Sequence, residues 1–263
     1  MITEQQIQLL VEATIEAGTK AKQLRNQGLK VEHKADGSLV TNADKELDAF
    51  FHQVIRNKLQ DSNIILSEED VASGTNIVAT NKPFWSIDPI DSTHSYVDNK
   101  SSYTVNLAFV DANNIPIFGI IHTPDNNTVW YGSLTYGAYK KVGNEPPKQI
   151  FTRKLKQEGA VLISSDEQIT PKALLKKLNI VEDLKMPSSV KFTYIAEGLA
   201  DFYTRKQNKA CDWDITPGHA LIVAAGGKVV FQAPTTNFKY GKPPYLAPCL
   251  LAIGDKGYDP STI

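Results

Sequence analysis

The spacing of apolar residues in the first 60 positions predicts two amphipathic helices. Over about residues 3–27, apolar or small side chains recur every three or four positions, which is typical of one buried helix face. The positions that define this face are Ile7, Leu10, Val11, Thr14, Ile15 and Gly18. The same spacing continues over about residues 43–59, on a face made of Leu47, Phe50, Phe51, Val54, Ile55 and Leu59. Residues 31–41, between the helices, are polar and rich in turn formers, so we expect a loop there.

Short apolar runs after residue 60 predict a series of strands. The runs 63–66 and 84–87 are each followed by acidic residues, so both strands deliver carboxylates at their ends. Four more runs are separated by Asp, Asn, Gly and Pro turns, and they span residues 103–110, 115–121, 128–131 and 136–140. Turns of this kind connect antiparallel neighbours. The first half of the chain is therefore expected to pack two helices against an antiparallel sheet.

The segment Asn144-Glu145-Pro146-Pro147 has the weakest pattern in the chain and is the best boundary between two lobes. We therefore expect an N-terminal α+β lobe over residues 1–146 and a C-terminal α/β lobe over residues 147–263. In the second lobe, predicted strands and helices alternate, which is typical of a smaller α/β layer. The strands lie near 159–163, 181–185 and 199–204, and the helices near 171–178, 188–197 and 215–225.

The composition is that of an ordinary globular protein and argues against several function classes. The 263 residues are 41% hydrophobic, and 28 Lys and Arg oppose 29 Asp and Glu, a formal net charge of −1. This balance argues against a nucleic-acid polymer or an anionic membrane as the main partner. The two cysteines, Cys211 and Cys249, lack the spacing of a disulfide framework or a thiolate zinc site. The sequence contains no recognisable signal peptide or transmembrane segment, so we predict a cytoplasmic protein.

The clearest candidate chemistry is the segment Asp88-Pro89-Ile90-Asp91 at the end of a predicted strand. Proline fixes φ and lacks an N–H donor, so we expect a rigid turn that aims both aspartates and the Ile90 carbonyl at one point. Oxygen-only ligands of this kind suit Mg²⁺. Ser92 and Thr93 would then begin a helical turn whose free N–H groups can bind phosphate. A simpler interpretation fits the segment alone: Asp91 only caps that helix and Asp88 lies in an ordinary turn.

A second acidic segment comes late in the chain, where Asp214 follows Trp213 and precedes an apolar helix. Gly226-Gly227 is expected to end that helix and to start the next strand. Considered alone, Asp214 fits an N-cap of that helix equally well. Cys211 has no paired histidine base, so a nucleophilic role is not expected. The five histidines show no ligand spacing to one another and are expected to be surface or packed residues: His33, His52, His94, His122 and His219.

Three segments taken together resemble the motifs of the inositol monophosphatase superfamily, a group of lithium-sensitive, magnesium-dependent phosphatases. They are Ser67-Glu68-Glu69, Trp85-Ser86-Ile87-Asp88-Pro89-Ile90-Asp91-Ser92-Thr93, and Trp213-Asp214 followed by Ala225-Gly226-Gly227. Their order and separation match over nearly the full chain. Within the superfamily, the chain most resembles the bacterial 3'(2'),5'-bisphosphate nucleotidases. The segments that carry this closer resemblance are 34–44, 103–108, 188–192 and 196–205.

The resemblance implies a fold, a cofactor and a reaction. The fold would be a layered α/β/α/β/α sandwich, in which an antiparallel sheet lobe joins a smaller α/β lobe and the site lies at their junction. The cofactor would be Mg²⁺, roughly two or three ions, and the substrate a small phosphate ester. The leading hypothesis is hydrolysis of the 3'-phosphate of adenosine 3',5'-bisphosphate to AMP and phosphate by a metal-activated water. Many relatives are dimers, so the resemblance is compatible with a homodimer.

Two alternatives to this hypothesis stay open. One is an inositol monophosphatase or a broad sugar phosphatase. The other, from a different class, is a catalytically weak homologue that acts as a binding or regulatory protein. Ser92 points toward the second alternative, because it replaces a glycine of the family beside the phosphate, where close backbone approach matters. Its amide donor is kept, so we expect an altered rate or metal affinity rather than lost chemistry.

Carried over position by position, the resemblance assigns a role to each candidate residue. The implied metal ligands are Glu68, Asp88, the Ile90 carbonyl, Asp91 and Asp214. The groups that would orient or activate the attacking water are Asp44, Glu68 and Thr93. The phosphate would lie against Ser92 and Thr93, and the rest of the substrate would contact Ser188, Lys191 and Arg205. Leu39, Thr216-Pro217 and the spacing of Arg205 from Trp213 also depart from the family pattern.

Overall fold

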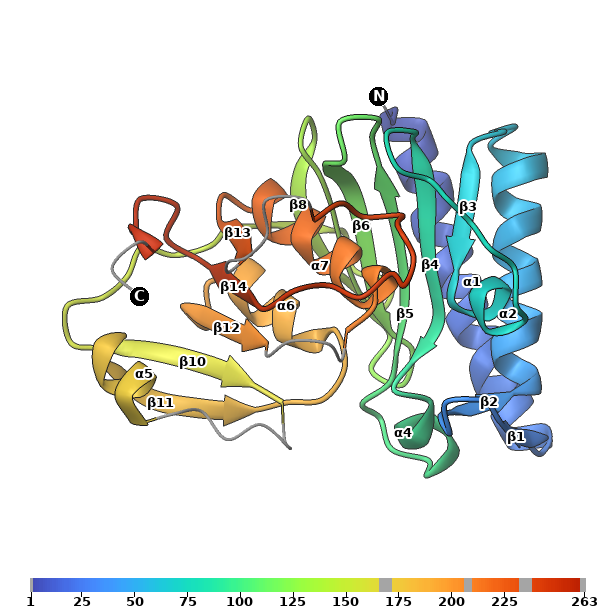
Figure 1. The fold of residues 1–263 in the computed structure, drawn as a ribbon, viewed down its shortest axis with the longest axis horizontal. Helices are drawn as coiled ribbons and strands as arrows, with labels where there is room; N and C mark the ends of the chain where they lie inside the picture. The colour runs from blue at the N-terminus through green and yellow to red at the C-terminus, as the bar shows by residue number, and fades with distance from the viewer. Residues whose placement is uncertain (1, 166–171, 206–209, 232–237, 261–263) are drawn as a thin grey trace.

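The chain folds into five layers in the order α/β/α/β/α, which confirms the predicted fold class (Figure 1). The computed structural model describes residues 2–165, 172–205, 210–231 and 238–260. A helical pair lies on one side of a seven-stranded sheet, two further helices lie between this sheet and a five-stranded sheet, and a short helix lies against the five-stranded sheet. No helix in these described ranges is long and apolar enough to cross a membrane.

The outer helical layer consists of α1, Glu4–Gln27, and α2, Asn42–Gln53, which continues as a π-helical turn η1, Val54–Lys58. Both helices were predicted from their apolar spacing, and each begins with a threonine cap, at Thr3 and at Thr41. The segment between them was expected to be a loop, but it forms an antiparallel hairpin of β1, Val31–His33, and β2, Leu39–Thr41. All three residues of β1 are exposed, so no apolar pattern marks this strand.

The seven-stranded sheet has the order β3-β4-β5-β6-β7-β8-β9. Only β3 and β4 are parallel, and every other neighbouring pair is antiparallel. The strands are β3 Ile64–Ser67, β4 Phe84–Asp91, β5 Thr104–Val110, β6 Pro116–Thr123, β7 Thr128–Ser133, β8 Gly137–Val142 and β9 Lys148–Ile150. The sequence did not predict β9, which follows the Pro146-Pro147 segment and pairs with β8. Two short helices follow strands of this sheet: α3, Glu68–Ala72, and α4, Thr93–Val97.

Both faces of this sheet are buried over strands β4 to β7, and alternate residues of these strands pack into different apolar clusters. On β4, Trp85 and Ile87 pack against α1 and α2, whereas Phe84 packs toward the middle helices. The middle helices are α6, Val190–Ala196, and α7, Asp212–Ala224. A helix covers each face, so the strands are apolar on both sides and lack the polar–apolar alternation of a half-exposed sheet.

The smaller sheet has the order β11-β10-β12-β14-β13. Its strands are β10 Ala160–Ser164, β11 Ile180–Lys185, β12 Phe202–Arg205, β13 Lys228–Phe231 and β14 Leu250–Ile253. The first three correspond to predicted strands, and β13 begins directly after Gly226-Gly227, where the next strand was expected, but β14 was not predicted. The short helix α5, Lys172–Lys177, contributes Leu174 and Leu175 to a third apolar cluster with the outer face of this sheet.

Helix α7 lies closest to the large sheet at β6, where Gly119 permits the contact. A Cβ atom at Gly119 would lie 2.3 Å from the Pro217 carbonyl oxygen, so no other residue fits without moving the helix. This contact fixes the depth of α7 between the two sheets. It thereby fixes the position of the helix N-terminus, which reaches the end of β4.

Candidate active site

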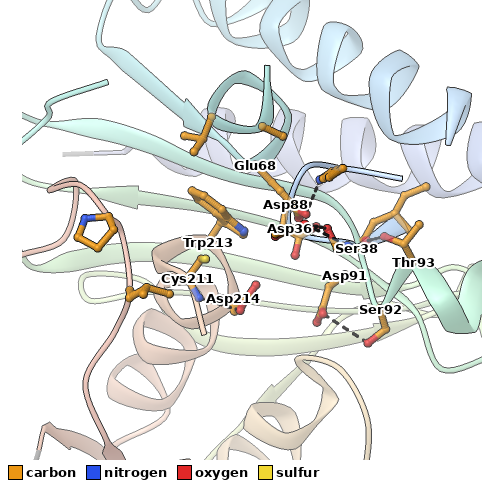
Figure 2. A pocket seen from close by; sticks show the side chains of 16 residues that line it. Asp36, Ser38, Glu68, Asp88, Asp91, Ser92, Thr93, Cys211, Trp213 and Asp214 are labelled. Atoms are coloured by element: carbon orange, nitrogen blue, oxygen red, sulfur yellow. Dashed lines mark hydrogen bonds and ion pairs between the residues drawn. The ribbon is translucent and has the colours of Figure 1, made fainter. Parts of the chain in front are cut away.

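The candidate active site is a cavity of about 410 Å³ where β4 ends beside the N-terminus of α7. Side chains from distant parts of the chain converge on it, and Figure 2 shows the carboxylates of Glu68, Asp88, Asp91 and Asp214 gathered in its centre. The β1–β2 hairpin supplies one edge of the cavity through Lys34, Asp36 and Ser38. Apolar residues form another wall, and they are Val71, Ala72, Trp213, Pro244 and Leu246.

An irregularity in β4 brings Asp88 and Asp91 into the same cavity. The prediction of a rigid turn after residue 87 is wrong, because the strand continues to Asp91. Its pairing with β5 shifts between Asp88, opposite Asn106, and Asp91, opposite Thr104. Residues three apart on a regular strand point to opposite faces, and the shift at Pro89 cancels this alternation. Proline suits the shifted position because it has no N–H to donate.

Asp214 reaches the two aspartates from α7, but not as the N-cap that the sequence suggested. Helix α7 begins at Asp212, and its N-cap residue is Cys211. Asp214 therefore lies in the first turn of the helix, where its Oδ2 accepts the Cys211 backbone N–H at 2.9 Å. One ligand oxygen from each of Asp88, Asp91 and Asp214 lies within 4.8 Å of the others. Three carboxylates this close repel one another unless a cation or protons neutralise them.

Glu68 begins α3 and faces the same cavity, where it pairs with Lys34 of the hairpin. The Lys34 Nζ lies 2.6 Å from Glu68 Oε1 and 2.8 Å from Glu69 Oε1. Burial alone would lower the lysine pKa, but the two carboxylates raise it above its ordinary value. Lys34 therefore stays charged and partly neutralises the acidic cluster. Lys34 begins the 34–44 segment of the family resemblance, but no role in the site was predicted for it.

The acidic cluster fits a divalent cation. Burial raises the pKa of Asp88 well above its ordinary value, and Glu68, Asp91 and Asp214 raise it further. Burial also raises the pKa of Glu68 to about 7 and that of Asp214 to about 6. Asp88 is 1% exposed, and its Oδ1 has no hydrogen-bond partner among the described residues. A buried carboxylate oxygen without a donor is costly, and a hard cation coordinated by several oxygens removes that cost.

Asp44 and Thr93 form a separate hydrogen-bonded pair at the edge of the cluster. Asp44 Oδ2 accepts the Thr41 backbone N–H at 2.7 Å and the Thr41 hydroxyl at 2.6 Å. Its Oδ1 lies 3.4 Å from the Thr93 hydroxyl, which is also 3.1 Å from the Ile90 carbonyl oxygen. Burial raises the Asp44 pKa to about 6, although its bonds to Thr41 oppose the shift. This carboxylate can therefore exchange a proton near neutral pH.

Ser92 connects β4 to α4 in a left-handed backbone conformation, with φ 68° and ψ 54°. This is the position at which the family motif carries glycine, and the conformation supplies the physical reason, since a Cβ atom is disfavoured there. Serine accepts the conformation at a cost and keeps its backbone N–H. Ser92 and Thr93 both line the main cavity.

A second cavity of about 250 Å³ adjoins the first and shares Asp91 and Ser92 with it. All three residues predicted to contact the substrate line this cavity: Ser188, Lys191 and Arg205. Lys191 is buried, and its Nζ donates to the Met186 carbonyl at 3.3 Å and lies 5.8 Å from the centre of the Tyr203 ring. Arg205 Nη2 lies 3.8 Å from Asp214 Oδ2. Every sequence-predicted site residue except Asp44 therefore lines one of two adjoining cavities, and Asp44 lies behind the wall, in contact with Thr93.

Several residues that orient the aspartates were missed in the sequence analysis. Asp91 Oδ2 accepts the Ser189 backbone N–H at 2.6 Å and the Ser189 hydroxyl at 2.8 Å. The Thr104 hydroxyl donates to the same oxygen at 3.1 Å, and the Asn106 amide donates to Ser189 Oγ at 3.0 Å. The sequence feature that could have revealed these residues is the presence of two polar side chains, Thr104 and Asn106, at alternate positions of the apolar strand β5.

Cys211 lines the main cavity, but its environment does not favour a nucleophile. Burial raises the pKa of its thiol, and Asp214, Glu68 and Asp212 add to the rise, so the reactive thiolate is suppressed. Both cysteines are free. The raised thiol pKa agrees with the expectation that Cys211 is not a nucleophile.

Residues 3–252 of the chain match the model of a protein family described as the inositol monophosphatase family. The chain is 32% identical over 201 residues to the 3'(2'),5'-bisphosphate nucleotidase CysQ of Escherichia coli K12, a match that covers 76% of this chain and 79% of that protein. It is 25% identical over 252 residues to the CysQ of Haemophilus influenzae, with 93% and 91% covered.

Among solved structures, CysQ from Bacteroides thetaiotaomicron is similar, with a TM-score of 0.73 and 25% identity over 95% of this chain and 97% of that one. The IMPase of Thermotoga maritima has a TM-score of 0.74 at 19% identity, over 96% and 93% of the two chains. At that identity the second likeness supports the fold alone.

Proposed function

Since the chain belongs to the inositol monophosphatase family of phosphatases, we propose that it hydrolyses adenosine 3',5'-bisphosphate to AMP and phosphate with Mg²⁺ as cofactor. The observation that carries this proposal is the pair of adjoining cavities, one acidic and one containing Lys191 and Arg205. The relatives named as CysQ carry the same substrate class in their name, 3'(2'),5'-bisphosphate nucleotidase. A substrate with two phosphates needs a cleavage site and a second anion site.

In this proposal, Glu68, Asp88 and the Ile90 carbonyl hold one cation, and Asp88, Asp91 and Asp214 hold another. When bound, such cations supply Lewis-acid charge that lowers the pKa of a water molecule and offsets the charge of the ester. The unpartnered Asp88 Oδ1 and the close approach of the three aspartates support this assignment. Lys34 holds Glu68 in position beside the cluster until a cation competes for that carboxylate.

The protein supplies the proton acceptor through Asp44 and Thr93. The Thr93 hydroxyl can pass its proton to Asp44 Oδ1 while its oxygen accepts one from the attacking water. The Asp44 pKa of about 6 suits this role, because an acceptor works best when its pKa lies near the working pH. The Thr41 bonds to Oδ2 keep the carboxylate in place and leave Oδ1 facing Thr93.

Lys191 and Arg205 are proposed to bind the 5'-phosphate that is not cleaved. Arginine presents a planar fork to phosphate, and lysine adds a compact positive charge. Both side chains line the smaller cavity beside Ser92, so a nucleotide could place its 3'-phosphate at Ser92 and extend toward them. Ser188, which is also in this cavity, offers a hydroxyl to the same ligand.

The test compares phosphate release from adenosine 3',5'-bisphosphate and from inositol 1-phosphate, with Mg²⁺ and the wild-type protein. We expect a higher kcat/KM for the nucleotide. Lys191→Met should raise KM for the bisphosphate at least about tenfold, as expected for loss of a charge-assisted contact, and should change KM for inositol 1-phosphate much less. A higher kcat/KM for inositol 1-phosphate would reject the nucleotide assignment, and Mg²⁺ binding without any turnover would favour the regulatory alternative.

A further inference from the structure

A second cluster of metal-ligating side chains lies outside the candidate active site, where α2 contacts α3. It consists of Asp48 and His52 on α2 and Asp70 on α3. We propose that these three side chains bind a zinc-type divalent cation. Neither the family resemblance nor the proposed reaction uses any of the three residues.

The geometry of the cluster suits a tetrahedral ion with one open position. Asp48 and His52 are four residues apart on one helix, so their side chains lie on the same face. His52 Nε2 lies 3.6 Å from Asp48 Oδ2 and 3.3 Å from Asp70 Oδ2. Ligands bound at about 2.0–2.1 Å to a tetrahedral zinc lie about 3.4 Å from each other. Both separations from His52 are close to this value, and all three ligand atoms lie within 4.8 Å of one another.

Two polar atoms of the cluster are buried and lack a hydrogen-bond partner among the described residues. They are Asp48 Oδ1 and His52 Nε2. Asp48 is only 9% exposed, and its carboxylate is directed toward the ring nitrogen of His52. Burial raises the pKa of Asp48, the Ser67 hydroxyl and His52 lower it, and Asp70 and Glu69 raise it again. A cation bound at this cluster would offset the charge of both carboxylates.

A protonated His52 between two carboxylates is the competing explanation. Both carboxylate oxygens lie within ion-pair distance of Nε2, but neither contact meets hydrogen-bond geometry, so an N–H at this position would be poorly directed toward either oxygen. A single N–H also cannot serve both carboxylates at full strength, whereas an ion can be coordinated by all three groups. Nitrogen in the ligand set favours zinc and related transition ions over Mg²⁺.

Histidine spacing does not reveal this cluster in the sequence, because it contains a single histidine. His52 has no histidine partner, and Asp70 comes from a separate helix. An ion here would join α2, which carries Asp44, to α3, which carries Glu68. Helix α3 has no buried residue of its own, so a cross-link to α2 would hold Glu68 in place. The side chains of His52 and Asp70 are about one-third exposed, 32% and 30%, so an ion can enter from solvent.

The experiment uses full-length protein stripped of metal with EDTA and titrated with Co²⁺ and Zn²⁺. To keep the main acidic cluster from obscuring the result, the titration is repeated in Asp88→Asn. We expect Co²⁺ to give the intense visible absorption of four-coordinate cobalt in both proteins, and Zn²⁺ to raise their melting temperature. His52→Gln should lower zinc affinity by more than about 100-fold, because it removes a direct ligand. His33→Gln, at an exposed histidine of β1, is the matched control and should bind as wild type does.

Equal zinc affinity in His52→Gln and His33→Gln would overturn the proposal. Wild-type protein gives a second measurement that does not depend on the folding of a variant. In its ¹⁵N spectrum, zinc should shift the Nε2 signal of His52, and an unchanged signal at saturating zinc would also overturn the proposal. Both measurements report binding directly, so they stand whether or not the protein hydrolyses adenosine 3',5'-bisphosphate.

Discussion

At the scale of single residues, the site depends on groups that hold a carboxylate as much as on the carboxylates themselves. Asp91 Oδ2 accepts three close hydrogen bonds, two of them from Ser189. Ser189 in turn is held by the Asn106 amide. These donors fix one oxygen of Asp91 and leave the other facing the cavity. Groups that orient a metal ligand in this way commonly change metal affinity about 10–100-fold when they are removed.

Ser189→Ala is therefore expected to weaken Mg²⁺ binding about tenfold while kcat at saturating Mg²⁺ stays close to wild type. The mutation removes the hydroxyl bond to Asp91 but keeps the backbone N–H bond, so the carboxylate loses only part of its support. The measurement is the dependence of hydrolysis rate on Mg²⁺ concentration. Ser188→Ala is the neighbouring control, because Ser188 lines the smaller cavity and should affect KM for the nucleotide instead. The same Mg²⁺ dependence in both variants would contradict this division of roles.

The sequence could predict the acidic residues but not the way each reaches the cavity. Asp88 and Asp91 share a short motif, and their carboxylates were expected to converge through a turn after residue 87. They converge instead through a shift of strand pairing, which depends on the register with β5. Asp214 was interpretable as an N-cap, but it lies inside the first turn of α7. Strand register and helix starts are set by tertiary contacts, so local patterns do not determine them.

At the scale of elements, one contact positions α7 against the large sheet. The close approach of the Pro217 carbonyl to Gly119 places the helix N-terminus, and with it Asp214, beside the end of β4. Elements with regular apolar patterns, such as α1 and α2, were predicted from the sequence. The exposed strand β1 and the late strand β14 were not, because short strands carry little pattern of their own.

Gly119→Ala should destabilise the protein by about 1–3 kcal/mol and weaken Mg²⁺ binding at the same time. The added Cβ would lie 2.3 Å from backbone, which cannot move aside as a flexible side chain would. Moving α7 outward shifts Asp214 away from Asp88 and Asp91. Urea unfolding and Mg²⁺ titration of the rate measure the two effects. Gly257→Ala is the control, since its Cβ would first meet a side-chain atom of Asp255 at 3.3 Å. Lost stability with unchanged Mg²⁺ dependence would show that α7 does not transmit the strain to the site.

At the scale of the whole molecule, folding itself assembles the acidic cluster. Glu68 and Asp88 follow different strands of one sheet, whereas Asp214 comes from a helix between the two sheets. In the unfolded chain these carboxylates are solvated and far apart, with ordinary pKa values near 4. In the folded protein, burial raises the pKa of Glu68 to about 7, that of Asp214 to about 6 and that of Asp88 well above its ordinary value. The metal-free fold therefore takes up protons that the unfolded chain releases.

This difference gives a defined sign to the pH dependence of stability. Groups whose pKa is higher in the folded state favour folding below about pH 4, and that contribution is lost as the pH rises through about 6 to 7. In EDTA, the free energy of unfolding should therefore fall between about pH 5 and pH 7, by at least about 1 kcal/mol. Saturating Mg²⁺ should reduce the fall, because the cation stabilises the ionised carboxylates of the folded state. Urea unfolding at several pH values, with and without Mg²⁺, measures both slopes.

Asp88→Asn removes one buried charge and should make the free energy of unfolding in EDTA less dependent on pH. A wild-type curve that rises over this range, with Asp88→Asn parallel to it, would mean that the cluster does not govern the stability of the metal-free protein.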